Sequence, residues 1–314
     1  MKKKFLIYAP SYNENNGGSI VEHKLCSILN NLGYEAYLHP LYTRFFEINK
    51  NTYHLSFRTL VGFIVSTIRK LYKDFRIYKN FKMNPAMNTQ LFDQKNTNFG
   101  EDWVIIYPEI AFGNPLKAKN VVRWLLHQPG FHTGQVFYGQ NELIFKFNSA
   151  IDDFDHVGCK TSDNELKVIH YPLEFYYNDK SLERKGTAYC LRKGKDKLIQ
   201  HDLTDSVLID GKSHKEVADI FRQVKTFVSY DTYTAYSIFA VLCGCESIVV
   251  PDEGVSEDEW YPNEQDRWGI SYGFDNMENA KNTASLVLKH ILSEEKKSIN
   301  NVENFVSEVE DYFD

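Results

Sequence analysis

The sequence lacks the cysteine patterns that mark several common classes of protein. It holds five cysteines, an odd number, with no C-x-x-C pair and no zinc-ligand spacing. A disulfide framework and a zinc site are therefore not expected, and this cysteine usage is typical of a reduced, cytosolic chain. We expect Cys243 and Cys245 to be small, buried side chains.

Long apolar runs are also missing. The longest candidate, LVGFIVSTI, is about half of the ~18–20 residues that a transmembrane helix needs. The first residues, MKKKFLIYAP, begin like a signal peptide, but their apolar run is short and the polar stretch SYNENNGG follows it. We therefore interpret KFLIYAP as a first strand.

Strong positive charge and the common nucleotide-binding motifs are absent as well. The formal net charge of −6 argues against general nucleic-acid binding. The chain has no G-x-G-x-x-G motif and no P-loop, which argues against a plain dinucleotide-binding enzyme. What is present is an ordinary globular composition, 43% hydrophobic and 25% charged, over 314 residues. That length suits two domains.

The first half of the chain alternates apolar strands with a helix. A strand, KFLIYAP, and a polar loop, SYNENNGGS, precede a helix, IVEHKLCSILNNLG, which Gly33 ends, and a second strand, YEAYLHPL, follows. Such a β–α–β unit opens a doubly wound sheet. Four later apolar runs predict further strands: EDWVIIYPE, VVRWLLHQPG, LIFKFN and HVGCKT.

The second half repeats this alternation. Four runs predict strands: GTAYCLRKG, DSVLIDG, TFVSYD and SIVVPD. Ser213, with Glu216 three residues later, forms a capping box that predicts the start of a helix, and a second helix is expected over TAYSIFAVLCG. A final helix is expected over NAKNTASLVLKHILSEE, followed by an acidic tail.

The predicted fold class is therefore α/β, with two doubly wound, Rossmann-like domains. We expect an N-terminal domain over residues 1–168, which carries a basic, aromatic insert at about 42–82. A second domain is expected over 169–295. Residues 296–314 are expected to form a C-terminal helix or tail that packs back on the first domain.

Asp231 is the first candidate functional residue. It follows the predicted strand TFVSY, and ligands of open α/β sheets bind outside the carboxyl ends of the strands. Thr232 and Thr234 follow, where the next helix would present free backbone N–H groups to a phosphate. Alternatively, Asp231 merely caps that helix.

This stretch resembles the donor-binding domain of GT-B glycosyltransferases, in particular the bacterial surface-polysaccharide enzymes with an E-x7-E motif (family 4-like). Asp231 matches the first acid, Ala240 and Gly244 match the small residues that end the helix, and ESIVVPD matches the next strand. The second acid, which holds the nucleotide ribose in that family, is replaced by Phe239. The ribose contact is thus lost or supplied by another residue.

The resemblance implies two domains that face one another across a cleft and a nucleotide sugar bound on the second domain. It implies that Arg192 and Lys193, with Lys195 as a weaker candidate, bind the donor diphosphate. It also implies that Gly17 and Gly18, in the first strand-to-helix loop, approach the donor phosphates or the acceptor; an ordinary turn is the alternative. No cofactor and no obligatory metal are implied.

Two residues of the first domain are candidates for the acceptor side. Glu109 and His127 each end a predicted strand, so either could position an acceptor hydroxyl or act as a base. His132 is a further candidate, although a histidine beside a Pro-Gly turn is often structural. Arg123 and Trp124 lie within a strand and are expected to be packing residues.

The insert at 42–82 carries nine basic residues against two acidic ones, with aromatic residues between them. One interpretation is a peripheral surface for anionic lipid, as a transferase with a lipid-linked acceptor would need. The other is a helical insert whose aromatic side chains fill the first domain's core. A third interpretation is that the acidic tail pairs with this basic region.

The sequence thus predicts a metal-independent, hexosyltransferase-type glycosyltransferase in the cytoplasm, at the inner face of the cytoplasmic membrane. It would transfer a sugar from a nucleotide sugar to a hydroxyl of a lipopolysaccharide or capsule glycan. Two alternatives remain: a catalytically degenerate GT-B protein that serves as a partner or scaffold, which Phe239 favours, and a GT-B-fold sugar-nucleotide epimerase.

Overall fold

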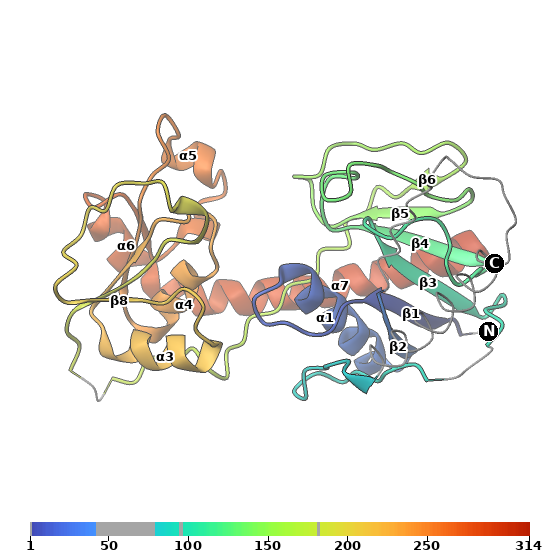
Figure 1. Ribbon diagram of the computed structural model, residues 1–314, viewed down its shortest axis with the longest axis horizontal. Helices are drawn as coiled ribbons and strands as arrows, with labels where there is room; N and C mark the ends of the chain where they lie inside the picture. Colours follow the sequence, from blue (N-terminus) through green and yellow to red (C-terminus); the bar gives the residue numbers. More distant parts are fainter. Residues whose placement is uncertain (1, 42–78, 94–96, 181–182) are drawn as a thin grey trace, which may run out of the picture. The chain divides into compact units, whose positions relative to one another are not determined.

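The computed structural model describes residues 2–41, 79–93, 97–180 and 183–314. The chain forms two compact units (Figure 1). Unit 1 comprises Met1–His170 and Lys297–Asp314, and unit 2 comprises Tyr171–Lys296. Each unit is built on its own sheet.

Unit 1 contains a six-stranded sheet whose strands all run parallel. Its spatial order is β2-β1-β3-β4-β5-β6. The inner strands are buried on both faces, as continuous apolar runs such as FLIYA and VIIY require. The strands are β1 (Lys4–Ala9), β2 (Glu35–Pro40), β3 (Trp103–Pro108), β4 (Asn120–Leu125), β5 (Leu143–Lys146) and β6 (Lys160–Thr161).

Among the residues that the structure describes, helices α1 and α7 cover one face of this sheet. Helix α1 (Gly17–Asn31) begins after Asn16, whose side chain accepts the Ser19 N–H, and ends before Gly33, which has a positive φ of 80°. The last part of helix α7 (Val287–Phe313) packs beside it. The shared core includes apolar residues at helical spacing on α7: Val302, Phe305, Val306 and Val309.

The other face of the unit 1 sheet packs against aromatic side chains. Leu6 and Tyr8 of β1 contact a cluster that contains Phe92, Phe99 and Trp103. Their rings meet edge-on or tilted at centroid distances of 5.3–5.7 Å, the arrangement that aromatic pairs prefer. Much of the chain's high aromatic content is thus core packing.

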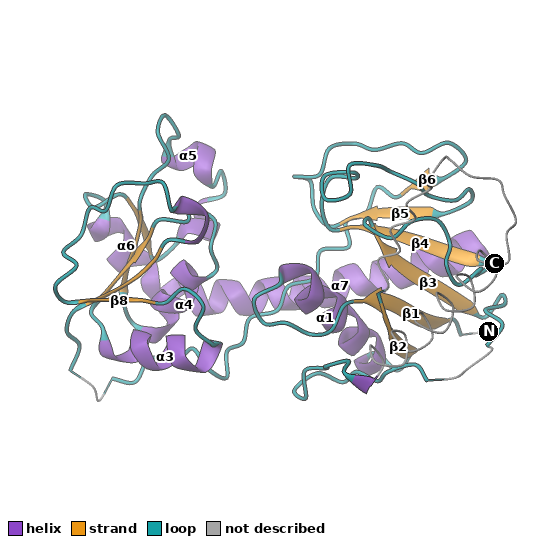
Figure 2. Ribbon diagram, viewed as in Figure 1, coloured by secondary structure: helices purple, strands orange, loops and turns teal. Residues whose placement is uncertain are grey.

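Unit 2 contains a five-stranded parallel sheet, shown with its helices in Figure 2. Its order is β11-β10-β9-β7-β8. Numbered within the unit this is 2-1-3-4-5 read from β8, one of the two common doubly wound orders. The strands are β7 (Thr187–Cys190), β8 (Ser206–Leu208), β9 (Thr226–Ser229), β10 (Glu246–Val249) and β11 (Ile270–Tyr272).

Helices pack on the unit 2 sheet through apolar clusters. The face that carries Phe227 contacts α3 and α4, while Val228 on the opposite face contacts Tyr230 and Val250. Both units therefore have the doubly wound, Rossmann-like arrangement. The unit 2 helices are α3 (His214–Gln223), α4 (Tyr236–Cys243), α5 (Glu257–Trp260) and α6 (Met277–Thr283), with 3₁₀ turns η1 (Arg192–Gly194), η2 (Glu264–Arg267) and η3 (Ala284–Leu286).

The α/β prediction is confirmed, and every strand predicted from the sequence is present. The Ser213–Glu216 capping box opens α3, and Gly244 ends α4 with a φ of 91°. Cys243 and Cys245 are buried, unpaired thiols. Their burial raises the pKa of Cys243 to about 11 and that of Cys245 to about 12.

Three helix predictions were wrong in their bounds. Gly17 and Gly18 are the first residues of α1, because Asn16 rather than a later residue caps the helix. Helix α4 begins at Tyr236, two residues later than expected. The single helix expected over 279–295 is α6, η3 and the start of α7, and the acidic tail continues α7 to Phe313 because its apolar residues pack on the unit 1 core.

Two findings concern membrane contact. Among the described residues, no helix is both long and apolar enough to cross a bilayer. Residues 42–78, most of the basic insert, lie outside the described residues. The three interpretations of that insert therefore stay predictions.

Candidate functional site

The unit 2 sheet has a switch point between β7 and β9. These strands are neighbours, but the chain goes from β7 outward to β8 before it returns to β9. Doubly wound sheets bind nucleotides at the carboxyl ends of the strands at such a point. Arg192 follows the end of β7 by two residues, and Asp231 follows the end of β9 by two residues.

Arg192 and Asp231 meet at this edge of the sheet. The Arg192 Nε lies 3.6 Å from Asp231 Oδ2. The Asp231 side chain is only 7% exposed, whereas that of Arg192 is 37% exposed. The guanidinium carbon also lies 5.3 Å from the centroid of the Tyr236 ring. The pair thus combines a fixed carboxylate with a cation that solvent or a ligand can reach.

The backbone around Arg192 is tightly held. Arg192 has a positive φ of 43°, which is uncommon for a residue with a side chain. Its N–H donates to the Asp210 carboxylate at 2.9 Å, beyond the end of β8. Gly194, the last residue of the η1 turn, is buried against Tyr230. A Cβ at residue 194 would lie 1.9 Å from the Tyr230 carbonyl oxygen. Only glycine permits this approach of the two loops.

Asp231 does not cap helix α4. The N-cap residue of α4 is Ala235, without a side-chain hydrogen bond. Asp231 Oδ1 instead accepts the Tyr233 N–H at 3.3 Å, within its own loop. Thr234 lies at the start of α4, where its Oγ1 accepts the Tyr236 N–H at 3.3 Å. The interpretation of Asp231 as a helix cap was therefore wrong.

A second charged pair, which the sequence analysis missed, adjoins this site. Lys197 Nζ lies 2.6 Å from Asp252 Oδ1, and Thr232 donates its hydroxyl to Asp252 Oδ2 at 2.7 Å. These two hydrogen bonds lower the pKa of Asp252. The run of basic residues in RKGKDK could have pointed to Lys197 as a site residue. Its pairing with Asp252 could not be foreseen, because it depends on the conformation of two loops.

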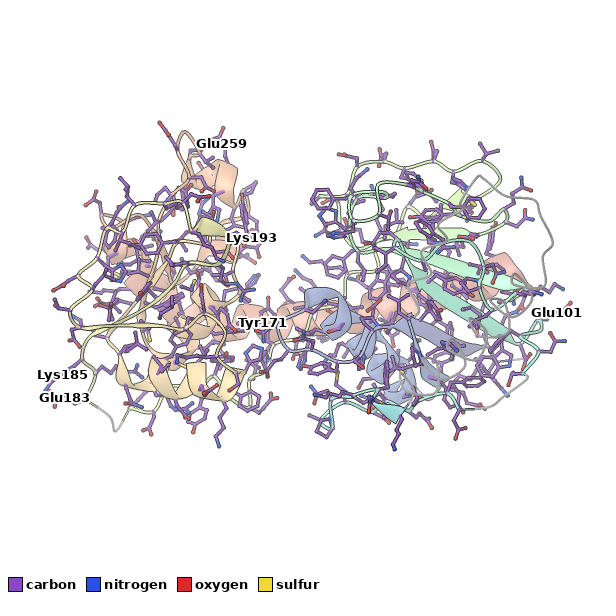
Figure 3. The ribbon with its side chains drawn as sticks, in the orientation of Figure 1. Glu101, Tyr171, Glu183, Lys185, Lys193 and Glu259 are labelled. Carbon is purple, nitrogen blue, oxygen red and sulfur yellow. The ribbon has the colours of Figure 1, made fainter. Side chains whose placement is uncertain are left out.

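Lys193 and Lys195 differ from these neighbours in their exposure. Both side chains lie at the surface of unit 2, and Figure 3 labels Lys193, the middle residue of η1. Within the described residues neither takes part in an ion pair. They are available cations next to the Arg192–Asp231 pair.

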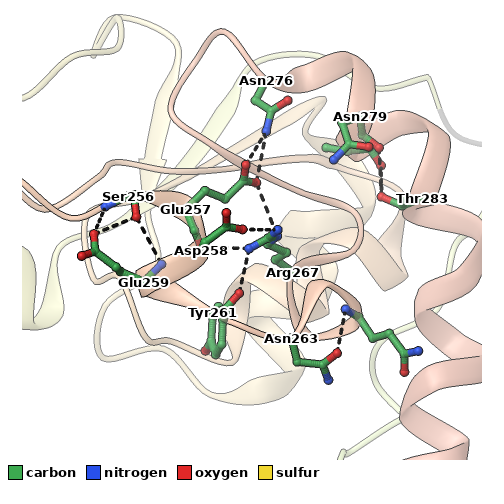
Figure 4. Close-up of polar contacts among 12 residues, drawn as sticks. Ser256, Glu257, Asp258, Glu259, Tyr261, Asn263, Arg267, Asn276, Asn279 and Thr283 are labelled. Atoms are coloured by element: carbon green, nitrogen blue, oxygen red, sulfur yellow. Dashed lines mark hydrogen bonds and ion pairs between the residues drawn. The ribbon is translucent and has the colours of Figure 1, made fainter.

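The segment after β10 is fixed to the same site. The Trp260 indole N–H donates to the Thr232 carbonyl at 2.8 Å, which anchors α5 against the Asp231 loop. Arg267 secures α5 from the other side: it donates to the carbonyl oxygens of Glu257 and Tyr261 and pairs with Asp258 at 2.7 Å (Figure 4). These contacts hold α5 in a fixed position next to the Asp231 loop.

Phe239, at the position of the second acid of the E-x7-E motif, lies in the core. It is 4% exposed, and its ring stacks on Tyr176 with a centroid distance of 4.2 Å. It therefore offers no group to a ligand. The described part of unit 2 brings three carboxylates to the Arg192 site: Asp210, Asp231 and Asp252.

Unit 1 has its own switch point, between β1 and β3. Glu109 follows β3 directly and is 6% exposed, and its Oε2 accepts the Leu126 N–H at 3.1 Å. Burial raises the pKa of Glu109, while hydrogen bonds and the charge of Arg123 act in the opposite direction. Glu109 is thus a carboxyl group with raised proton affinity at the binding edge of the sheet.

His127 lies two residues beyond the end of β4, beside Glu109. Its Nδ1 accepts the Gln128 N–H at 2.8 Å, which places the proton of the neutral ring on Nε2. In that tautomer His127 is a hydrogen-bond donor rather than a base. Its ring stacks on Phe131 at 4.1 Å and meets His132 edge-on at 4.8 Å. Phe131 is 69% exposed, so this aromatic cluster lies at the surface.

Arg123 and Trp124 are packing residues, as expected from the sequence. Arg123 is fully buried and forms two hydrogen bonds of 2.9 Å to the carboxylate of Glu142. It also donates to the carbonyl oxygens of Ala111 and Gly113, at 2.7 and 2.9 Å. These bonds fix the loop that follows Glu109.

Gly17 and Gly18 open the first turn of α1 in unit 1. A Cβ added at Gly17 would meet no described atom within 4 Å, and one at Gly18 would lie 3.7 Å from a methyl carbon of Leu126. Neither has a positive φ. Their geometry therefore fits an ordinary helix start, and no contact in the described residues gives them a phosphate-binding role.

Within the described residues, no group of three His, Cys, Asp or Glu side chains could hold a metal ion. One D-x-D triplet, a spacing associated with metal-bound sugar nucleotides, is present at Asp153–Asp155 in unit 1. Asp153 lies 2.7 Å from Lys146 Nζ, and this cation lowers its pKa. The triplet is not part of the Glu109 or Arg192 sites described above.

Comparisons with known proteins give only distant likenesses. No protein-family model and no curated protein matches this chain. Among solved structures, TarM aligns over 100% of this chain and 99% of its own at 10% identity and a TM-score of 0.41. Sucrose-phosphate synthase from Thermosynechococcus elongatus aligns over 100% of this chain and 95% of its own, at 10% identity and a TM-score of 0.40. The calicheamicin glycosyltransferase CalG4 aligns over 99% of this chain and 98% of its own, at 10% identity and a TM-score of 0.36. At these TM-scores the alignments establish neither a common family nor a common activity.

Proposed function

We propose that this protein is a glycosyltransferase of the GT-B type, with its nucleotide-sugar donor bound by unit 2. The observation that carries the proposal is the Arg192–Asp231 pair at the switch point of the unit 2 sheet. The motif resemblance of the sequence from Asp231 to Gly244 supports it independently.

The donor diphosphate is assigned to the cations of the η1 turn. Arg192 and Lys193 would bind the phosphate oxygens, next to the start of α4 with Thr234. Asp231, with the neighbouring Thr232, would bind a hydroxyl of the sugar or the ribose. Because Phe239 is buried, we assign the role of the missing second acid to Asp252, which accepts the hydroxyl of Thr232 next to Asp231.

The acceptor is assigned to unit 1, at Glu109 and His127. The Nε2–H tautomer makes His127 a donor that positions an acceptor oxygen. Glu109 is then the group that takes the hydroxyl proton. The exposed ring of Phe131, which stacks on His127, offers an apolar face of the kind on which sugar rings pack.

The chemistry follows from these assignments. The acceptor O–H bond breaks, and its proton passes to a Glu109 carboxylate oxygen. The hydroxyl oxygen bonds to the anomeric carbon of the donor, whose bond to the diphosphate breaks. The diphosphate leaves with the bonding electron pair, and Arg192 and Lys193 stabilise its new charge without a metal ion.

We further propose a hexosyl donor and a glycan acceptor of lipopolysaccharide or capsule type. The sequence resemblance and the basic, aromatic composition of residues 42–82 support a lipid-linked acceptor and peripheral contact with an anionic membrane. Retention of the purified protein on vesicles with anionic lipid, but not on neutral vesicles, tests that contact.

A thermal-shift panel of UDP-, GDP-, CMP- and dTDP-sugars tests donor binding. We expect one nucleotide class to raise the unfolding temperature, since a ligand at 100 times its Kd stabilises the fold by about 2.7 kcal/mol. Arg192→Ala and Asp231→Asn should abolish or weaken this shift. Lys215→Ala removes an exposed charge from α3 and should leave the shift intact.

Other outcomes lead to other functions. A panel without any shift would refute the proposal and favour a scaffold. Conversion of the nucleotide sugar in the absence of any acceptor would favour an epimerase.

A further inference from the structure

Glu22 is a carboxyl group that unit 1 buries without a hydrogen bond. It lies on α1 and is 2% exposed. Among the residues that the structure describes, none donates a hydrogen bond to it or forms an ion pair with it. A buried, unpaired carboxylate costs several kcal/mol, so such a group normally takes up a proton.

Helix α1 brings Glu22 to the Glu109 site. Gly18 and Glu22 are four residues apart and therefore lie on the same face of the helix. That face adjoins Leu126, because a Cβ at Gly18 would lie 3.7 Å from the Leu126 Cδ1. The Leu126 N–H in turn donates to Glu109 Oε2 at 3.1 Å. Glu22 and Glu109 therefore both border Leu126 from different elements, and the charge of Glu109 acts on Glu22.

The surroundings of the two groups separate their proton affinities. Burial raises the pKa of Glu22 well above its usual range, and the negative charge of Glu109 raises it further. The pKa of Glu109 is also raised by burial, but the Leu126 N–H and the charge of Arg123 favour its ionised form. No comparable interaction favours the ionised form of Glu22.

We propose that Glu22 is the protonated, positioning partner of an ionised Glu109, so that unit 1 carries an acid–base pair of carboxyl groups at its switch point. Protonated Glu22 does not repel the Glu109 charge. Glu109 keeps the lone pair that accepts a proton. When two neighbouring carboxyl groups differ in this way, the environment assigns the acid and the base.

The inference rests on the proposed function only for the source of the proton that Glu109 accepts. During transfer that proton comes from the acceptor hydroxyl, while the proton on Glu22 is neither gained nor lost. The protonation states themselves do not depend on whether the protein transfers a sugar.

Infrared spectroscopy of the full chain at neutral pH tests the protonation of Glu22 directly. We expect a C=O stretch of a protonated carboxylic acid in the wild type. It should persist in Glu109→Gln, because burial is the larger cause, and disappear in Glu22→Gln. A wild-type spectrum without this band would overturn the proposal even if no variant folds.

The titration of Glu109, followed by the NMR signal of its ¹³C-labelled carboxyl carbon, provides a second test. If Glu22 is neutral, Glu22→Gln replaces one neutral group by another, and the pKa of Glu109 should stay unchanged. If Glu22 is ionised, the same substitution removes a repulsive charge and lowers the pKa of Glu109, which would refute the assignment.

Activity separates this inference from the proposed function. Where transfer is measurable, Glu109→Gln should reduce kcat by roughly 10²- to 10⁴-fold. Glu22→Gln should preserve the pH profile of kcat. If no transfer is found while both spectroscopic results hold, the proposed function fails and the carboxyl pair stands.

Discussion

Arg123 and Glu142 form an ion pair that is almost wholly removed from solvent, with side chains 0% and 1% exposed. Five hydrogen bonds use every donor of the guanidinium group, and the rings of Tyr107 and Tyr138 lie at 5.1 and 4.4 Å from it. Desolvation offsets most of the attraction in such a pair, but loss of one partner leaves an uncompensated charge. At the residue scale, this pair holds the loop after Glu109 in place.

We predict that Glu142→Leu lowers the free energy of unfolding by roughly 3–5 kcal/mol, because Arg123 stays buried and charged. The double variant Arg123→Met/Glu142→Leu should lose less than the sum of the two single variants. Urea denaturation of the three variants measures both quantities. Lys119→Ala, which removes an exposed ion pair with Glu101, is the control and should be close to wild type. Additive losses in the double variant would contradict the prediction.

At the scale of elements, the η1 turn (Arg192–Gly194) joins the ends of β7 and β9 through one glycine. The φ of Gly194 is not positive, so the position needs glycine for space alone. A methyl group there overlaps the Tyr230 carbonyl, which belongs to the strand end that also presents Asp231. The turn therefore has to move away from Asp231 if residue 194 has a side chain.

We predict that Gly194→Ala destabilises unit 2 by about 1–3 kcal/mol, the range for overpacked sites, and abolishes the nucleotide-dependent thermal shift. Thermal unfolding with and without the stabilising nucleotide sugar measures both effects. Gly100→Ala is the control, because a Cβ there makes only an ordinary contact of 3.7 Å. If Gly194→Ala binds the nucleotide as tightly as the wild type, η1 is not the phosphate-binding turn.

The same elements show how far the sequence predicts this structure. Apolar runs identified the strands because parallel strands are buried on both faces. Arg192 and Asp231 could be predicted to share one site. Each follows a strand, and the doubly wound strand order makes these two strands neighbours. The contact of Lys197 with Asp252 could not, since it depends on two irregular loops. Residues 296–314 were expected to form a helix or tail on the first domain, and the end of α7 does pack on the unit 1 core there.

At the scale of the whole molecule, buried histidines make stability depend on pH. His39 is 7% exposed, and burial lowers its pKa from 6.5 to about 4. As the pH falls below 6.5, the unfolded chain gains a proton at His39 that the folded chain does not bind until about pH 4. Stability is therefore lost across this window. Glu22 and Glu109, with raised pKa values, contribute in the opposite direction.

We predict that acidification from pH 6.5 to 4 removes about 3 kcal/mol of unit 1 stability through His39, given 1.36 kcal/mol per pKa unit. His39→Gln should be less stable than the wild type at neutral pH, but its unfolding free energy should fall less steeply in this range. Urea denaturation at a series of pH values measures the two slopes. Equal slopes would show that His39 does not titrate as described; His23, whose pKa is also lowered, contributes to both proteins alike.

The core of unit 1 draws on both ends of the chain. Phe5 and Ile7 of β1 pack in the same cluster as Phe305 and Val309 of α7. During synthesis on the ribosome, the strands of unit 1 are translated before unit 2, whereas the α7 side chains that complete their core are translated after it. All of unit 2 is made in between. The α7-facing side of the unit 1 sheet therefore stays uncovered in a nascent chain until all of unit 2 has been translated.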